Sequence, residues 1–265
     1  MKSAALTLFL AMLLCAACAL GEALPLEEME HAEIAVVALP GEPGALDGPD
    51  ELPLSPQREE MIDGILALAR QLYDKAGGQP QRAHYSGDIY VCKNFTVHLF
   101  NQTARGYRIA EYPDVPLVIP GNLPKAECAP YSYGVAWKDI PAEQGNPFYI
   151  AASFRYDTSL SDGENRENAR AFLMQAQRGD YFQMAANYYY GVGAHSMIFS
   201  ADYDPQTDTV CWTDSNMKGE RRGGERYGYV QYDAVQEIDW FVDAFCRPNY
   251  GATIYRLRND IIAAP

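Results

Sequence analysis

The sequence lacks the features that mark several large classes of protein. Only 21 of its 265 residues are Lys or Arg, against 35 Asp or Glu, and the formal net charge is −14. Because no basic cluster is present to neutralise phosphates, we expect no binding of nucleic acid. Four histidines and six cysteines show none of the paired spacings that ligate zinc, so we expect no metal and no cofactor. Four of the six cysteines lie beyond residue 19, and four are too few for a disulfide-stapled scaffold in a chain of this length.

The longest apolar run lies at the N-terminus and is too short to predict a membrane span. Lys2 is followed by an apolar stretch of about export-signal length, and Ala17 and Ala19 fit a small-x-small cleavage site. We therefore expect residues 1–19 to be an export signal. The protein would be secreted or held in the cell envelope, without a transmembrane domain. A lipid anchor on Cys18 is the alternative to free secretion.

An acidic segment without Lys or Arg follows this run. Nine acidic residues lie between Glu22 and Gln57, so most of the net negative charge belongs to this part of the chain. Residues 20–54 are also rich in Pro, Gly and Ala, which predicts a mostly disordered linker. The remaining residues, 55–265, are numerous enough and apolar enough to form one domain with a full core.

Capping residues mark the helices of this domain. Ser55 and Pro56 are typical of a helix start, and Gly77 is typical of a helix end. The apolar stripe between them is formed by Met61, Ile65, Leu68 and Leu72. A capping box at 161–164 opens another helix, which should run to about residue 177. A further helix should begin near Cys92, because Cys92, Phe95 and Leu99 share one helical face.

Apolar runs and turn signals predict an antiparallel sheet in the C-terminal half. Strands are expected at 181–184, 194–200, 210–214, 229–232 and 253–258. The turn at 204–208 joins the second and third of these into a hairpin. Asp233 is expected to cap a helix that carries Val235, Ile238, Phe241 and Phe245. Residues 105–160, rich in Pro and Tyr in their first part, are expected to form an elaborated insertion. Early helices followed by such a sheet predict an α+β fold.

One cysteine, one histidine and one polar residue are placed to act together. A helix start and a neighbouring imidazolium both favour the thiolate form of cysteine, and Cys92 lies in the first turn of its helix. His195 lies near the start of one arm of the hairpin and Asp214 near the end of the other, so the turn brings them side by side. Asp214, or Asn216 on the same face, can then hold the second imidazole nitrogen. We predict these four as catalytic residues.

This order of residues resembles that of the papain-like superfamily, in particular the CHAP amidases and the NlpC-type cell-wall peptidases. Residues 193–199 resemble their histidine strand, and residues 210–217 resemble the CHAP strand on which an acid and an Asn lie two apart. Residues 178–181, Arg-Gly-Asp-Tyr, are similar to the Gly-Asp that opens the preceding strand, and residues 254–257 to the closing strand. Around Cys92 the sequence Val-Cys-Lys-Asn-Phe departs from the small or Gly-containing pattern of both families.

The resemblance implies a papain-like α+β domain in which N-terminal helices carry the nucleophile and pack on the antiparallel sheet. It implies attack of Cys92 on an amide carbon, with His195 as base and then acid, and with backbone N–H groups at the helix start holding the oxyanion. The expected substrate is a peptide or a cell-wall amide in a bacterial envelope. Two alternatives stay open: a non-catalytic papain-like module that binds a peptide or glycan, and a surface interaction protein presented on the acidic segment.

Overall fold

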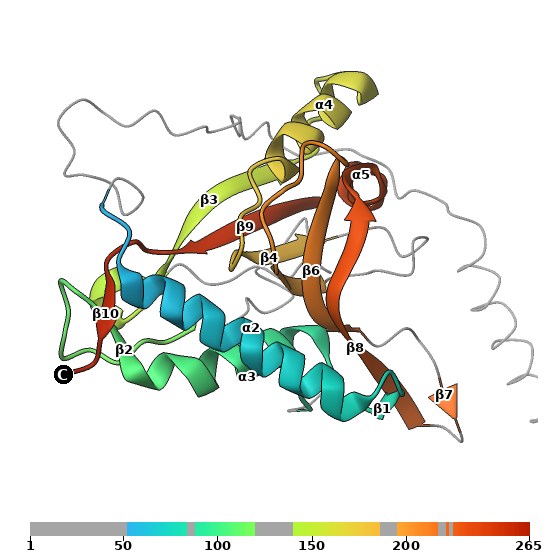
Figure 1. The fold of residues 1–265 in the computed structure, drawn as a ribbon. Helices are drawn as coiled ribbons and strands as arrows, with labels where there is room; N and C mark the ends of the chain where they lie inside the picture. Colours follow the sequence, from blue (N-terminus) through green and yellow to red (C-terminus); the bar gives the residue numbers. More distant parts are fainter. Residues whose placement is uncertain (1–51, 84–87, 120–139, 186–194, 217–220, 223–224) are drawn as a thin grey trace, which may run out of the picture. The chain divides into compact units, whose positions relative to one another are not determined.

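The computed structural model of this chain is shown in Figure 1. The residues it describes are 52–83, 88–119, 140–185, 195–216, 221–222 and 225–265. They belong to the second of the two units into which the chain divides, Met1–Ala35 and Val36–Pro265. The predicted export signal, the Cys18 anchor and all but the last residues of the predicted linker lie outside the described part. Among the described residues, no helix has the length and apolar character needed to span a membrane.

The described part contains four α-helices, and the caps predicted from sequence are present on two of them. The helix α2 (Pro56–Ala76) begins after Ser55, whose hydroxyl accepts the Arg58 N–H, and it ends at Gly77 in the left-handed conformation. The helix α4 (Asp162–Leu173) begins with the predicted capping box and is shorter than expected. The other two helices are α3 (Cys92–Thr103) and α5 (Ile238–Phe245).

Among the described residues, a large sheet in which all strand pairings are antiparallel organises the fold, so the predicted α+β class is confirmed. Its strands, in spatial order, are β1 (Gln81–Arg82), β8 (Glu225–Glu237), β6 (Thr209–Asn216), β5 (His195–Phe199), β4 (Tyr181–Ala185), β9 (Gly251–Leu257) and β3 (Phe148–Arg155). The short strand β7 (Arg221–Arg222) pairs with β8. A separate two-stranded sheet joins β2 (Tyr107–Ile109) to β10 (Ile261–Ala263).

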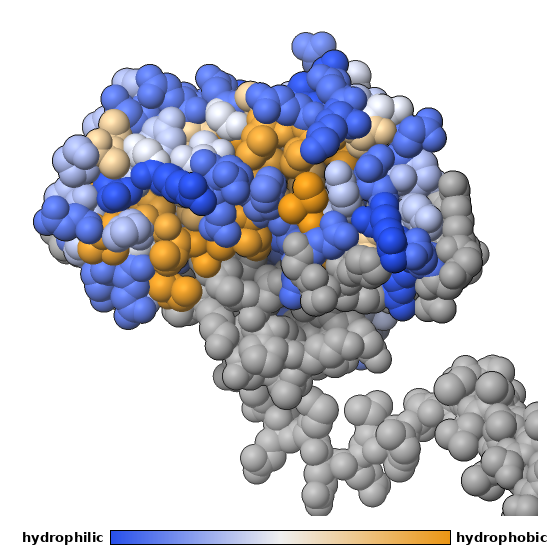
Figure 2. Space-filling model, turned by 90° about the horizontal axis from the view of Figure 1, so that it is seen from below, coloured by the Kyte–Doolittle hydropathy of each residue, from blue (hydrophilic) through white to orange (hydrophobic). Residues whose placement is uncertain are grey.

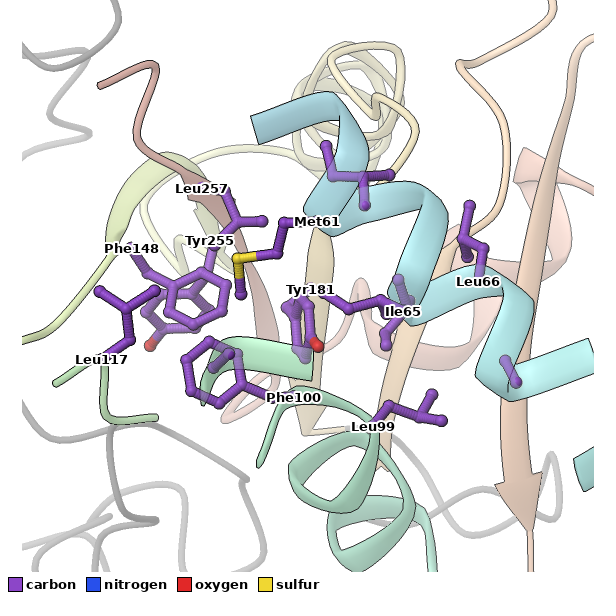
Figure 3. Close-up of a cluster of buried hydrophobic side chains, with 14 of the residues drawn as sticks. Met61, Ile65, Leu66, Leu99, Phe100, Leu117, Phe148, Tyr181, Tyr255 and Leu257 are labelled. Carbon is purple, nitrogen blue, oxygen red and sulfur yellow. The ribbon is translucent and has the colours of Figure 1, made fainter. Parts of the chain in front are cut away.

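The large sheet separates two hydrophobic clusters. Successive residues of one strand point to opposite faces. Accordingly, Tyr181 of β4 packs with α2 and α3, whereas its neighbour Phe182 packs with α4 and α5. Figure 1 shows the two helix pairs on these two sides. Figure 3 shows Met61 and Ile65 of α2 and Phe100 of α3 converging on Tyr181 in the first cluster. The helix carrying Cys92 is thereby fixed against one face of the sheet.

The surface of the described part is mostly hydrophilic at its rim. Figure 2 views the molecule from below Figure 1, the side on which α3 lies, and shows hydrophobic residues gathered toward the middle of this face. The large hydrophobic residues that are exposed come from several different elements and are Leu54, Val118, Ile150, Met174 and Val235.

Two features of the sheet differ from the expectations from sequence. Residues 148–155 fall within the expected insertion at 105–160, where no strand was predicted, but they form the edge strand β3; a register shift between Ile150 and Ala152 breaks the alternation that would have marked it. The expected short strand at 229–232 is part of the 13-residue strand β8, and Asp233 lies inside that strand instead of capping a helix. The helix after it begins only at Ile238, and Val235 is an exposed strand residue.

Candidate active site

Cys92 is the first residue of α3. Val91 precedes it in an extended conformation and provides no side-chain cap. The turn before the helix is held by Asp88, whose carbonyl oxygen accepts the Val91 N–H at 3.2 Å and the Asn94 side-chain amide at 3.0 Å. Since the first N–H groups of a helix have no acceptor within the helix, the Cys92 thiol lies beside donors that can bond to it and at the positive end of the helix dipole.

His195 opens β5 and is almost completely buried, with 3% of its surface exposed. Its Nε2 atom lies 2.5 Å from Oδ2 of Asp214 on β6. The same ring is also hydrogen-bonded to the Cys92 thiol. Because Nε2 is engaged by Asp214, Nδ1 is the nitrogen that faces the sulfur. The structure therefore brings Cys92, His195 and Asp214 together in one hydrogen-bonded chain.

The Cys92 sulfur also accepts a hydrogen bond from the backbone N–H of Ser196, the second residue of β5. Along β5, Phe199 donates its N–H to Asp180 beside β4, and Ser200 donates to Cys211 on β6. By alternation, the Ser196 N–H points toward β6. The paired residues of β5 and β6 are only 198–199 with 212–213, and the Ser196 N–H is bonded to Cys92 instead. The sulfur thus occupies the place where the two strands diverge.

The charges and donors of the site favour an ion pair. Burial raises the pKa of the Cys92 thiol, but the hydrogen bond and charge of His195 and the N–H groups of Ser196 and Lys93 outweigh it, so this pKa is lowered overall. Burial lowers the pKa of His195, but Asp214 and Cys92 outweigh it and raise this pKa to about 10. Both shifts favour a thiolate and an imidazolium at neutral pH, the reactive state of a cysteine nucleophile.

Of the two alternatives for the orienting residue, Asp214 is the one that holds the ring. Asn216 lies two residues further along β6, opposite Tyr229 of β8, where the strand ends. Asp214 is 1% exposed, and its second oxygen, Oδ1, accepts the side-chain amide of Gln231 on β8 at 2.9 Å. Sequence reasoning missed Gln231, because the sequence predicted a strand at 229–232 but not which of its residues lies opposite Asp214 on β6.

Other candidate groups lie away from this chain of residues. His98 is partly exposed on α3, and burial lowers its pKa; His84 lies outside the described part. Cys211 and Cys246 are free thiols, and burial raises the pKa of each. A cavity of about 220 Å³ at the far end of α3 is lined by Asn101, Ala104, Arg105, Arg108, Pro116 and Leu117 and contains no nucleophile. In the described ranges no three His, Cys, Asp or Glu side chains gather as a metal site would require.

A scan against models of protein families gave no match for this chain, and searches of curated proteins and of solved structures gave none either.

Proposed function

We propose that this protein is a cysteine hydrolase of the papain-like kind that cleaves an amide bond. The observation that carries the proposal is the buried His195 ring, which is bonded to the Cys92 thiol on one side and to the Asp214 carboxylate on the other. A nucleophile, a base and a residue that orients the base are the three parts of a catalytic triad. Asp214, and not Asn216, takes the orienting role.

The chemistry follows from these positions. The Cys92 thiolate attacks the carbonyl carbon, and the oxyanion that forms is held by N–H groups at the start of α3, including that of Cys92. His195 gives its Nδ1 proton to the leaving nitrogen, the C–N bond breaks, and a thioester remains. Water then attacks the thioester while His195 takes its proton, and Cys92 leaves as the thiolate. The Asp214 carboxylate stabilises the imidazolium at both stages.

The fold supports the papain-like interpretation without being specific to it. A helix that begins at the nucleophile precedes the strand with the base, which pairs with the strand bearing the acid. This is the order that suggested the CHAP and NlpC-type families. The residues next to Cys92 depart from those families, so the geometry of the triad, and not the local motif, is the support for the nucleophile.

The substrate class is proposed from the N-terminus. An export signal at 1–19 would place the enzyme outside the cytoplasm or, with a lipid anchor on Cys18, on the cell envelope. A peptide or a cell-wall amide is the substrate that fits such a location. The acidic composition argues against a nucleic-acid substrate.

Alkylation of Cys92 tests the proposal before any substrate is known. The full-length protein is treated with iodoacetamide at pH 7, and the modified cysteine is identified by mass spectrometry. We expect Cys92 to react at least about 10-fold faster than Cys211, since the thiolate fraction of an ordinary thiol at this pH is only a few per cent. The substitution His195→Ala should abolish the difference, whereas His98→Ala, on the same helix as Cys92, should leave it unchanged.

Two outcomes would contradict the proposal that this protein is a hydrolase. A Cys92 that reacts no faster than Cys211 would favour a non-catalytic papain-like module that binds a peptide or glycan. Rapid labelling that survives His195→Ala would show that the imidazole does not activate the sulfur. The third alternative, a surface interaction protein, is tested separately: if it is correct, Cys92→Ala should change no phenotype.

A further inference from the structure

Strand β8 holds the acid of the site. Gln231 lies directly opposite Asp214 in the β6–β8 pairing, and its Nε2 donates to Oδ1 of Asp214 at 2.9 Å. The other oxygen, Oδ2, faces His195. A carboxylate only accepts hydrogen bonds, so the amide must present its N–H to it. Both oxygens of Asp214 are thereby fixed, one by the imidazole and one by the amide.

Gln231 is itself fixed by the neighbouring strand. Its backbone carbonyl oxygen accepts the hydroxyl of Thr213 at 2.7 Å, and Thr213 is fully buried. Two adjacent residues of β6 therefore contact Gln231: Thr213 bonds to its backbone and Asp214 bonds to its side chain. The Thr213 contact fixes the backbone of Gln231 relative to β6 and thereby the position from which its side chain reaches Asp214.

A bulge in β8 makes the Gln231 side chain point to the same face of the sheet as Asp214. Trp212 lies opposite Ala234, but two residues further on, Asp214 lies opposite Gln231, so β8 contributes one extra residue between these pairs. An unbroken register would set Tyr232 against Asp214. Tyr232 instead packs with Tyr73 of α2 on the other face. Since side chains alternate, the extra residue exchanges a tyrosine for an amide beside the acid.

Asp233 supplies the conformation that the bulge needs. Its φ is +49°, in the left-handed region, which Asp tolerates better than most residues and which β-branched residues avoid. Its side chain is exposed. The residue expected from sequence to cap a helix therefore has a different role, in shaping the strand beside the site.

We propose that Gln231, set in place by the β8 bulge at Asp233, is a positioning residue that acts on His195 through Asp214; this rests on the proposed function. Among the described residues, the titratable groups that face His195 are Asp214 of β6 and Cys92 of α3, and its neighbour on β4 is the apolar Met184. The group that faces Cys92 is His195. The Gln231 amide bonds to Asp214 and can thus affect the ion pair of Cys92 and His195 without contacting either residue.

The test is the pH profile of Cys92 alkylation by iodoacetamide in the full-length protein. Gln231→Met keeps the length of the side chain but removes the donor, and Gln231→Asn keeps the amide but shortens its reach. In both variants the carboxylate is less firmly held, so the midpoint of the profile should rise by up to about one pH unit, the typical effect of one hydrogen bond to a charged group. Below both midpoints the rate should fall by up to about 3-fold, because a thiolate of higher pKa is scarcer but more nucleophilic.

Matched controls separate positioning from loss of structure. Gln236→Met makes the same change on the same strand opposite Val210, and its midpoint should equal that of the unmodified protein. Asp233→Val should raise the midpoint by straining the bulge, whereas Asp233→Gly, which accepts a positive φ, should not. Thermal unfolding of each variant shows that it is folded before its profile is compared.

The results distinguish this inference from the proposed function. If His195→Ala slows the alkylation of Cys92 but both Gln231 variants keep the original midpoint, the triad stands and the positioning role of Gln231 is refuted. If Asp233→Val also keeps the midpoint, the role of the bulge is refuted. If His195→Ala has no effect, the proposed function itself fails.

Discussion

Replacing Gly228 by alanine should displace the nucleophile without touching it. Gly228 lies on β8 where the strand passes the turn before α3, and a Cβ added there would come well within 3.0 Å of the Tyr90 carbonyl oxygen. The glycine has no unusual φ, so the effect of the substitution is steric alone. Because Tyr90 lies two residues before Cys92, the turn and the sulfur have to move together.

The size of the effect follows from the clash. To reach an ordinary contact of 3.4 Å, the turn has to move by about 1 Å, and a misplacement of that size costs up to about 100-fold in reactivity. Overpacking of this kind also costs about 1–3 kcal/mol of unfolding free energy. We expect Gly228→Ala to slow the iodoacetamide reaction of Cys92 at pH 7 by at least 10-fold, within the bound that the misplacement sets.

Two other glycines serve as controls. Gly251→Ala would create a comparable clash with the Phe154 carbonyl oxygen, between β9 and β3, and should lower stability while leaving the Cys92 rate unchanged. Gly106→Ala meets no atom within 4 Å and should change neither quantity. The reasoning is refuted if Gly228→Ala and Gly251→Ala lower the Cys92 rate equally, or if Gly228→Ala leaves it unchanged.

Three further predictions concern stability. In a Cys92→Ala background, which removes the coupled thiol, the hydrogen bond and charge of Asp214 still raise the pKa of His195. This raised pKa should contribute stability that is complete below pH 6.5 and is lost as the pH rises through the folded-state pKa; urea unfolding should show this loss, and His195→Gln should remove it. Phe182→Ala should cost about 3–5 kcal/mol, because its buried ring contacts Phe199, Phe241 and Phe245. Ser161→Ala should cost about 1 kcal/mol by breaking the capping box of α4, measured by thermal unfolding.

The elements found from sequence are those determined by local chemistry. Ser55 and Gly77 bound α2 because a side-chain cap and a left-handed residue are needed at the ends of a helix wherever it packs. His195 and Asp214 were paired from the hairpin turn, which sets which strands are neighbours. The contact of Cys92 with that hairpin rested on a resemblance in residue order, since no local pattern specifies where α3 packs.

The features that were missed depend on pairing between distant strands. The extra residue near Asp233 is visible only against β6, and the same holds for the register shift in β3 against β9. Each shift reverses which side chains face a given side of the sheet, and the shift in β8 places Gln231 beside Asp214. A single sequence contains no record of which residue opposes which across a sheet, so neither the amide on Asp214 nor the edge strand was predicted.

The place of Cys92 at the very start of α3 restricts how this chain can vary in length. Each helical residue turns by about 100° about the axis and advances by about 1.5 Å. One residue inserted between Cys92 and Phe95 would therefore rotate the thiol away from both the imidazole and the Ser196 N–H. The number of residues in this turn is as strictly fixed as the identity of the cysteine, whereas the exposed Lys93 beside it is free to change.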